Sequence, residues 1–240
     1  MNKKWNKVKI IKLITLIVVL AICVYATIYL YPIIKNISTP QGQQNFKNEI
    51  TNSGIKGTLM LFYLELAQII LAVLPGEPLE VLAGMCYGSV GGAIFIMISV
   101  FISTTAIFYL VKRFGKKLVY EFFSKEKIDK IENSKLFNNP KKIEKIMIVL
   151  FLIPGTPKDL LVYIGGLLPI KPSRFILIST FVRFPSVISS TIAGTSIING
   201  EWKKTIFVYL LTLIFVIVIL FIIKLFDKNK ETQKALDIIK

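Results

Sequence analysis

Long apolar segments, two of them broken by prolines and glycines, dominate the hydrophobic and polar pattern of this chain. Uncharged runs long enough to cross a hydrocarbon core, which takes about 20 helical residues, cover Leu13 to Ile34, Val81 to Val111 and Thr205 to Ile223. A fourth run extends from Phe175 to Gly200 if it continues through Arg183. The pattern predicts an all-α polytopic membrane protein.

Basic residues between these runs predict the orientation, because cytoplasmic loops carry an excess of lysine and arginine. Five lysines and no acidic residue precede the first run, which places the N-terminus in the cytoplasm. Asn36 to Gly57 is polar and nearly neutral, which predicts an external loop. Lys112 to Lys145 holds eleven basic and five acidic residues, which predicts an internal loop. The charged tail from Lys224 to Lys240 places the C-terminus inside as well.

The two broken segments are explained by hairpins that enter and leave the membrane on one side. Thr58 to Val111 has 54 residues between an external and an internal loop, so two full spans would return the chain to the wrong side. One full span plus a hairpin that turns at Pro75, Gly76 and Pro78 uses all 54 residues and ends on the correct side of the membrane. Ile146 to Ile170 has basic residues on both sides and its own break, which predicts a second hairpin from the cytoplasm. The residues of that break are Pro154, Gly155 and Pro157.

The two breaks match at an offset of 79 residues and would enter from opposite sides, as in an inverted repeat. The predicted fold is therefore four full transmembrane helices plus two opposed re-entrant helical hairpins. Paired broken helices of this kind form the binding sites of many secondary transporters. The predicted divisions are 1–56 (basic N-terminus, first span and external loop), 57–200 (the hairpin domain) and 201–240 (last span and tail).

The candidate site consists of the ionisable residues beside the breaks and of Arg183, an unpaired charge in a long apolar stretch. A charge at membrane depth costs a few kcal/mol unless it is paired, so it indicates function by default. The candidate substrate-binding residues are Glu77, Glu80, Lys158, Asp159 and Arg183. In this interpretation Lys158 and Arg183 bind an anion, Asp159 orients Lys158, and the two glutamates gate access or couple a proton.

Structural roles compete with this interpretation. Glu77 or Glu80 could pair with Lys158 or Arg183 to hold the hairpins together, and Glu77 could extend to the interface. Glu65 is either solvated or internal. Ser103, Thr104 and Thr105 are expected to bond back to their helix. The glycines at small-xxx-small spacing are expected to let helices approach closely; they are Gly84, Gly88, Gly91 and Gly92.

Composition removes several functional classes. The chain is 54% hydrophobic, has a mean hydropathy of +0.65 and a net charge of +16. Because the lysines lie between apolar segments, this charge indicates positive-inside loops rather than nucleic-acid binding. With no histidine, a Ser-His-Asp triad and a histidine metal site are excluded. Cys23 and Cys86 have no disulfide or metal spacing. We expect neither a catalytic site nor a metal nor a cofactor.

The motifs at these positions resemble those of the VTT-domain proteins, the DedA superfamily or SNARE-associated Golgi proteins. The likeness runs from about Leu61 to Ser196 and rests on PGEPLEVLAGMCYGSVGG, FYLVKRFGKK, FLIPGTPKDLLVYIGGL and FVRFPSVISSTIAG. It is nearest to the bacterial branch related to the Golgi Tvp-type proteins. The resemblance implies facing re-entrant hairpins and transbilayer movement of phospholipids or polyprenyl phosphates, with Glu77 at the family's acidic position.

Three departures from the DedA pattern bear on mechanism. Thr105 stands where those proteins carry an acid, and Phe151 and Pro157 stand where they carry arginines, so proton coupling is not implied for this chain. We expect a scramblase or flippase for an anionic lipid phosphate in a bacterial plasma membrane, with membrane lipids as partners. The alternatives are a proton-coupled transporter of a small solute and a membrane-protein scaffold. Homo-oligomerisation stays open.

Overall fold

The computed structural model describes residues 40–71, 76–120, 124–133, 139–152 and 158–226. The chain divides into two compact units, residues 1–49 and 50–240, and each is described by itself. The described part of the first unit, residues 40–49, belongs to α2 (Pro40–Asn52). A loop was expected there. Proline at the first helical position, followed by glutamines with good helix propensity, explains the helix.

Helices make up all the regular structure of the second unit in its described residues, which confirms the predicted all-α fold class. The described basic segments after residue 114 form the small helices α5 and α6. The helices are α3 (Ile55–Leu71), α4 (Glu77–Phe114), α5 (Lys116–Val119), α6 (Lys125–Asn133), α7 (Pro140–Leu152), α8 (Lys158–Leu167), α9 (Pro172–Phe181), α10 (Phe184–Ile198) and α11 (Trp202–Phe226).

Three helical stretches in the described residues are long and apolar enough to cross a membrane: Glu77–Phe114, Pro172–Ile198 and Trp202–Phe221. They correspond to three of the four spans that the sequence predicts. The remaining predicted span, Leu13 to Ile34, lies outside the described residues. The second stretch combines α9 and α10, which meet at Val182 and Arg183.

Gly88 divides α4 into two arms, residues 77–87 and 89–114. Its backbone has φ 76° and ψ 172°, which is not helical. A Cβ on Gly92 would lie 2.8 Å from the carbonyl carbon of Ala83. In a continuous helix these residues would be about 13 Å apart along the axis. The chain therefore reverses direction at Gly88, and the second arm is the longer of the two. The sequence had assigned Gly88 to helix packing alone.

Gly88→Ala should destabilise the protein by about 1–3 kcal/mol, because the backbone region that Gly88 occupies is accessible almost only to glycine. No neighbouring atom lies within 4 Å of an added Cβ, so the effect would come from the backbone and not from a clash. Thermal unfolding of the purified protein in detergent would measure it. Val90→Ala, at a side chain 66% exposed, is the control and should change stability by less than about 0.5 kcal/mol.

The first arm of α4 packs on α10 with almost no space between the backbones. A Cβ on Gly84 would lie 2.2 Å from the Thr191 carbonyl oxygen, and one on Gly194 would lie 2.1 Å from the Val81 carbonyl oxygen. The Thr195 hydroxyl also donates a hydrogen bond to the Gly84 carbonyl at 3.0 Å. The predicted close helix approach is therefore correct at Gly84. It brings the charged start of α4 next to α10.

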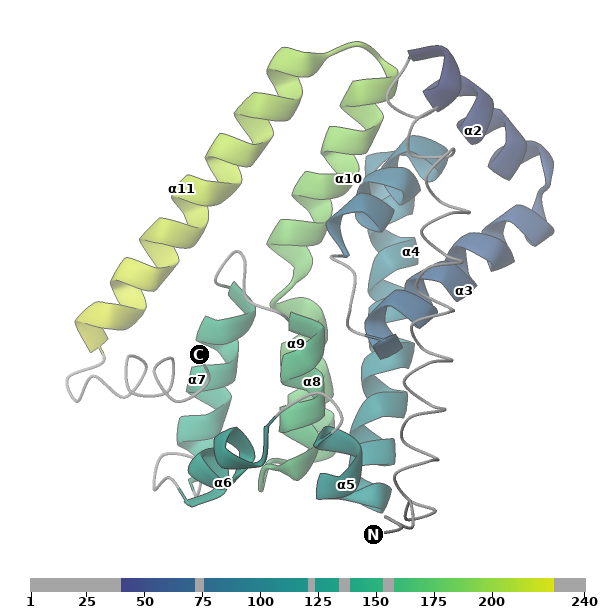
Figure 1. Ribbon diagram of the computed structural model, residues 1–240. Coiled ribbons are helices and arrows are strands. Elements are labelled where there is room, and N and C mark those ends of the chain that lie inside the picture. The colour runs from purple at the N-terminus through teal and green to yellow at the C-terminus, as the bar shows by residue number, and fades with distance from the viewer. Residues whose placement is uncertain (1–39, 72–75, 121–123, 134–138, 153–157, 227–240) are drawn as a thin grey trace, which may run out of the picture. The chain divides into compact units, whose positions relative to one another are not determined.

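Two adjacent glycines seat α8 between α4 and α9. A Cβ on Gly165 would lie 2.1 Å from the Phe175 ring of α9, and one on Gly166 would lie 2.6 Å from the Val111 side chain of α4. In Figure 1, α7 and α8 lie in the lower part of the second unit, while α9 and α10 together run along its length. The junction of α9 and α10 thus comes close to the start of α8.

Two of the three hydroxyl groups that the sequence predicted to bond back to their own helix do so in the second arm of α4. The third, the buried Thr104 hydroxyl, has no hydrogen-bond partner among the described residues. Ser103 donates to the Ser99 carbonyl at 2.8 Å and Thr105 to the Phe101 carbonyl at 2.7 Å. These bonds satisfy the hydroxyls within the helix, so neither is needed for an interhelical contact.

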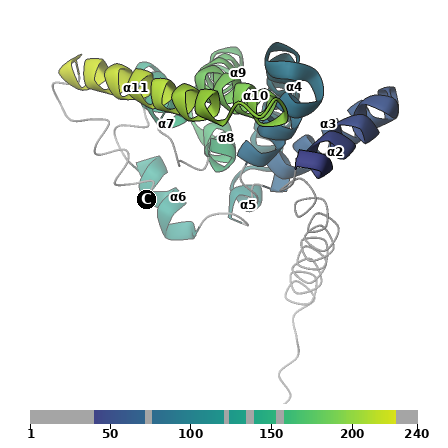
Figure 2. The same cartoon turned by 90° about the horizontal axis from the view of Figure 1, so that it is seen from above.

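α11 lies along one side of the second unit, next to α10 and α7 (Figure 2). Its sequence is apolar all round, and only 11% of its most hydrophobic window is buried. In water so large an exposed apolar surface would be unfavourable, but in a bilayer the acyl chains cover it. One face of α11 therefore meets lipid, and the other faces the interior.

Candidate functional site

The first turn of α8 contains the Asp159 carboxylate, which joins three separate parts of the fold. Arg183, between α9 and α10, donates from Nη1 to Asp159 Oδ1 at 2.6 Å. Gln68, near the end of α3, donates from Nε2 to Asp159 Oδ2 at 2.9 Å. Tyr163 of α8 donates to the carbonyl of Ile70, so a second bond joins α8 to α3. The chain around both predicted breaks is thus connected by polar contacts.

Arg183 is enclosed, with 6% of its surface exposed. Its guanidinium carbon lies 5.1 Å from the centre of the Phe151 ring, a favourable cation–π arrangement. Nε and Nη2 have no hydrogen-bond partner among the described residues. Ion pairing, ring stacking and burial together fix the side chain at the junction of α9 and α10.

Two further acids lie in the same region. Glu65 of α3 is buried at 2% exposure, which decides between the solvated and internal alternatives. It lies within electrostatic range of Glu80, Asp159 and Arg183. Glu80, in the first turn of α4, lies beside the Ser190 hydroxyl of α10. The site therefore contains more carboxyl groups than the sequence analysis assigned to it.

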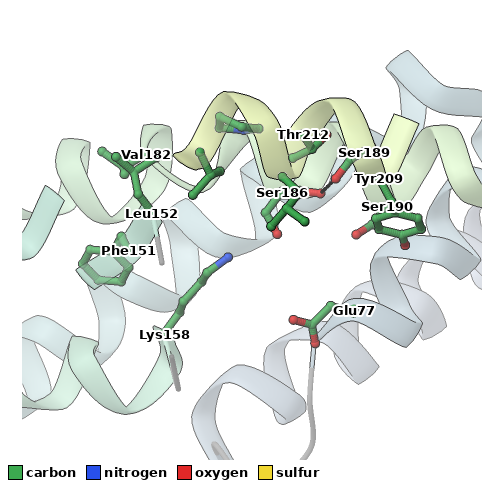
Figure 3. A pocket seen from close by; sticks show the side chains of 13 residues that line it. Glu77, Phe151, Leu152, Lys158, Val182, Ser186, Ser189, Ser190, Tyr209 and Thr212 are labelled. Atoms are coloured by element: carbon green, nitrogen blue, oxygen red, sulfur yellow. Dashed lines mark hydrogen bonds between the residues drawn. The ribbon is translucent and has the colours of Figure 1, made fainter. Parts of the chain in front are cut away.

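A cavity of about 320 Å³ opens beside this charged cluster, between α4, α7, α8, α10 and α11. Figure 3 shows the Lys158 amine and the Glu77 carboxylate directed into it from different helices. The other polar groups that line it are hydroxyls, and the rest of the wall is apolar. The hydroxyl-bearing residues are Ser186, Ser189, Ser190, Tyr209 and Thr212, and the apolar ones are Phe151, Leu152, Val182, Pro185, Leu213 and Val216.

The five predicted site residues thus separate into two groups. Glu77 and Lys158 line the cavity, whereas Glu80, Asp159 and Arg183 lie behind it. Asp159 was expected to orient Lys158, but its carboxylate receives hydrogen bonds from Arg183 and Gln68. The structural alternative named Glu77 or Glu80 as the acid that pairs with Lys158 or Arg183, whereas the acid bound by Arg183 is Asp159.

Of the predicted break residues, Gly76 and Pro78 lie at the start of α4, where Gly76 accepts the first backbone bonds of the helix. The remaining break residues lie outside the described residues: Pro75, Pro154, Gly155 and Pro157.

Several lining residues were missed from the sequence. Ser186, Ser189 and Ser190 follow the i, i+3, i+4 spacing of one helical face, a signal that could have identified them. Gln68 follows Glu65 by three residues and shares its helix face in the same way. Tyr209 gave no signal, since a single tyrosine in an apolar helix is also typical of a membrane interface.

No group of three or more Cys, Asp or Glu side chains among the described residues is arranged to hold a metal ion. The arrangement is suited to binding a ligand. An ammonium group and a carboxylate face a small cavity with hydroxyl groups between them, and the apolar helix α11 forms one wall of this cavity.

A family model described as the VTT domain matches residues 74–196 of the chain, a segment that includes the starts of α4 and α8 and all but the last two residues of α10. Comparison with curated proteins and with solved structures gives no match.

Proposed function

This chain belongs to the VTT-domain family, the DedA or SNARE-associated membrane proteins, and on that premise we propose that it carries lipid phosphate headgroups between the two leaflets of a membrane. We also propose that the protein lies in the plasma membrane with its α5–α6 end in the cytoplasm. The basic residues at that end support the orientation, among them Lys112, Arg113, Lys116, Lys125 and Lys130.

The observation that carries the proposal is the cavity of about 320 Å³ beside α11. Small-molecule sites typically measure about 300–1,000 Å³, so this cavity can hold a headgroup but not acyl chains. One wall of the cavity is formed by α11, a helix with most of its surface exposed. A headgroup could occupy the polar interior while its acyl chains stay in the bilayer, which is the geometry that transbilayer movement requires.

The hairpin arrangement is part of the proposal. α3 ends at Leu71 and α4 begins at Glu77, while α7 ends at Leu152 and α8 begins at Lys158, so both helix boundaries recur 81 residues later. In the first copy the short first arm of α4 is followed by its longer second arm. In the second copy the short helix α8 is followed by the longer stretch of α9 and α10. We therefore propose that α3 with the first arm of α4, and α7 with α8, are re-entrant hairpins of an inverted repeat. Their facing ends would place the cavity near the bilayer centre.

Lys158 has the central role in binding the phosphate. Its ammonium group points into the cavity from the first turn of α8, where backbone N–H groups without helical partners also favour an anion. Arg183 acts differently from the sequence-based expectation, because it does not line the cavity. By binding Asp159, the residue next to Lys158, it fixes the helix turn that carries the amine.

Lys158→Ala should slow lipid movement in reconstituted vesicles by about 10- to 100-fold, since a hydrogen bond to a charged group contributes about 1.5–3 kcal/mol. The rate would be measured with fluorescent lipids that start in the inner leaflet. Their fluorescence is lost when they reach the outer leaflet, where an externally added quencher acts. Lys145→Ala removes an exposed lysine of α7 that does not line the cavity and should retain the wild-type rate. Equal rates for the wild type and Lys158→Ala would refute the assignment.

A further inference from the structure

The cavity presents one positive and one negative group to its contents, and both are placed by helix starts. Glu77 begins α4 and Lys158 begins α8. Figure 3 shows the two side chains directed into the same space from different helices. Among the described residues, all others that line the cavity are uncharged. A ligand that fills this space therefore meets an anion and a cation together.

The surroundings of the cavity do not favour a ligand that is only negative. Four carboxyl groups and two basic groups interact electrostatically there: Glu65, Glu77, Glu80 and Asp159 with Lys158 and Arg183. Even if Glu65 and Glu80 both hold a proton, these six groups have no net positive charge. A phosphate monoester with two negative charges would find no excess of cations to balance it.

Two of the hydroxyl groups add acceptors rather than donors. Ser189 donates its single proton to the Ser186 carbonyl at 2.7 Å, and Thr212 donates its proton to the Val208 carbonyl at 2.9 Å. A hydroxyl that has used its proton in this way can only accept further bonds. Ser189 and Thr212 therefore offer lone pairs to the cavity, as the Glu77 carboxylate does.

Together these groups define a complementary headgroup. Lys158 supplies N–H donors for a phosphate, while Glu77, Ser189 and Thr212 supply acceptors for a cationic group that carries N–H donors of its own. A primary ammonium has three such donors. A quaternary ammonium has none and is bound in proteins chiefly by cages of several aromatic rings. The aromatic residues that line this cavity are Phe151 and Tyr209.

We propose that the cavity selects a headgroup in which a primary ammonium accompanies the phosphate, and that Glu77 is the residue that determines this specificity. The inference rests on the proposed lipid transport and specifies its substrate class. Glu77 would accept from the ammonium while Lys158 donates to the phosphate. Removing the charge of Glu77 would therefore change which headgroup moves, not only how fast.

The test uses the full chain in phosphatidylcholine vesicles with trace lipids that carry the same acyl-chain fluorophore and differ only in headgroup. The three probes are phosphatidylethanolamine, phosphatidylcholine and phosphatidic acid. The wild type should move the ethanolamine lipid about tenfold faster than the choline lipid, the effect of one charge-assisted hydrogen bond. Glu77→Gln should slow the ethanolamine lipid about tenfold and accelerate phosphatidic acid. Glu126→Gln, at an exposed position of α6, should keep the wild-type order.

Opposite changes for two probes cannot come from a loss of folded protein, which would slow all three alike. A wild type that moves all three headgroups at one rate would overturn the specificity while leaving lipid transport intact. So would a Glu77→Gln variant that slows all three equally. If the wild type moves no lipid, the proposed function fails. The specificity is then tested by thermal shift with glycerophosphoethanolamine and glycerophosphocholine, and equal shifts for both would reject it.

Discussion

Replacing Arg183 with alanine should lower the free energy of unfolding by about 3–5 kcal/mol, the usual cost of removing one partner from a buried ion pair. Asp159 would keep its bond to Gln68 but lose the charged donor that lies 2.6 Å away. The Phe151 ring would lose its stacked cation. Thermal unfolding in detergent would show the loss. Lipid movement should fall as well. Asp159 follows Lys158 directly, so the loss of its Arg183 partner would leave the turn of α8 that carries the Lys158 amine less firmly held.

The chain offers a matched control for this variant. Arg174 pairs with Glu144 at 2.9 Å, but its side chain is 60% exposed, so Arg174→Ala should cost less than about 1 kcal/mol. Adding Asp159→Asn to Arg183→Ala should recover part of the stability, since the uncompensated carboxylate disappears. If Arg183→Ala and Arg174→Ala were equally mild, the buried pair would have no structural role. Full stability with unchanged lipid movement would remove Arg183 from the mechanism as well.

Gly194→Leu should prevent the native packing of α4 on α10, at a cost above about 3 kcal/mol. Even a Cβ at this position would lie 2.1 Å from the Val81 carbonyl oxygen. That obstacle is backbone, so a rotamer change cannot relieve it, and overpacking of this kind moves whole helices. The purified variant should lose its single peak in size-exclusion chromatography, or unfold at a much lower temperature.

Gly91→Leu is the matched substitution for Gly194→Leu. Gly91 lies on an exposed part of α4, and its Cβ would meet only the Cβ of Tyr87, at 3.3 Å. This variant should stay folded, with a change in stability of less than about 1 kcal/mol. If Gly194→Leu were tolerated as well, the close contact between α4 and α10 would not be needed for the fold.

The position of Arg183 also explains one departure from the DedA pattern. Those proteins carry an arginine where this chain has Phe151. Here Arg183 comes from the junction of α9 and α10 and lies over the Phe151 ring. The cation at this place is therefore supplied by a different helix, and the phenylalanine is the surface on which it rests.

Hydropathy and charge counting by themselves determined the helical class and the approximate limits of three spans, among them Thr205 to Ile223 within α11. They also selected the five charged residues around the breaks. These features depend on local chain composition, because a segment that is apolar over about 20 residues enters a bilayer whatever its neighbours are. The same arithmetic required a hairpin between Thr58 and Val111 and placed its turn at Pro75, Gly76 and Pro78, but it did not predict the reversal at Gly88 between the two arms of α4.

Only the tertiary structure decided which charges meet. Asp159 is adjacent to Lys158 in sequence, yet its partners are Arg183 and Gln68, 24 and 91 residues away. Likewise, the serines of α10 and Tyr209 of α11 line one cavity with Glu77 and Lys158 because glycines let the helices approach closely. Side-chain pairing depends on which helix faces come into contact. That is a property of packing between distant segments, which local sequence patterns do not encode.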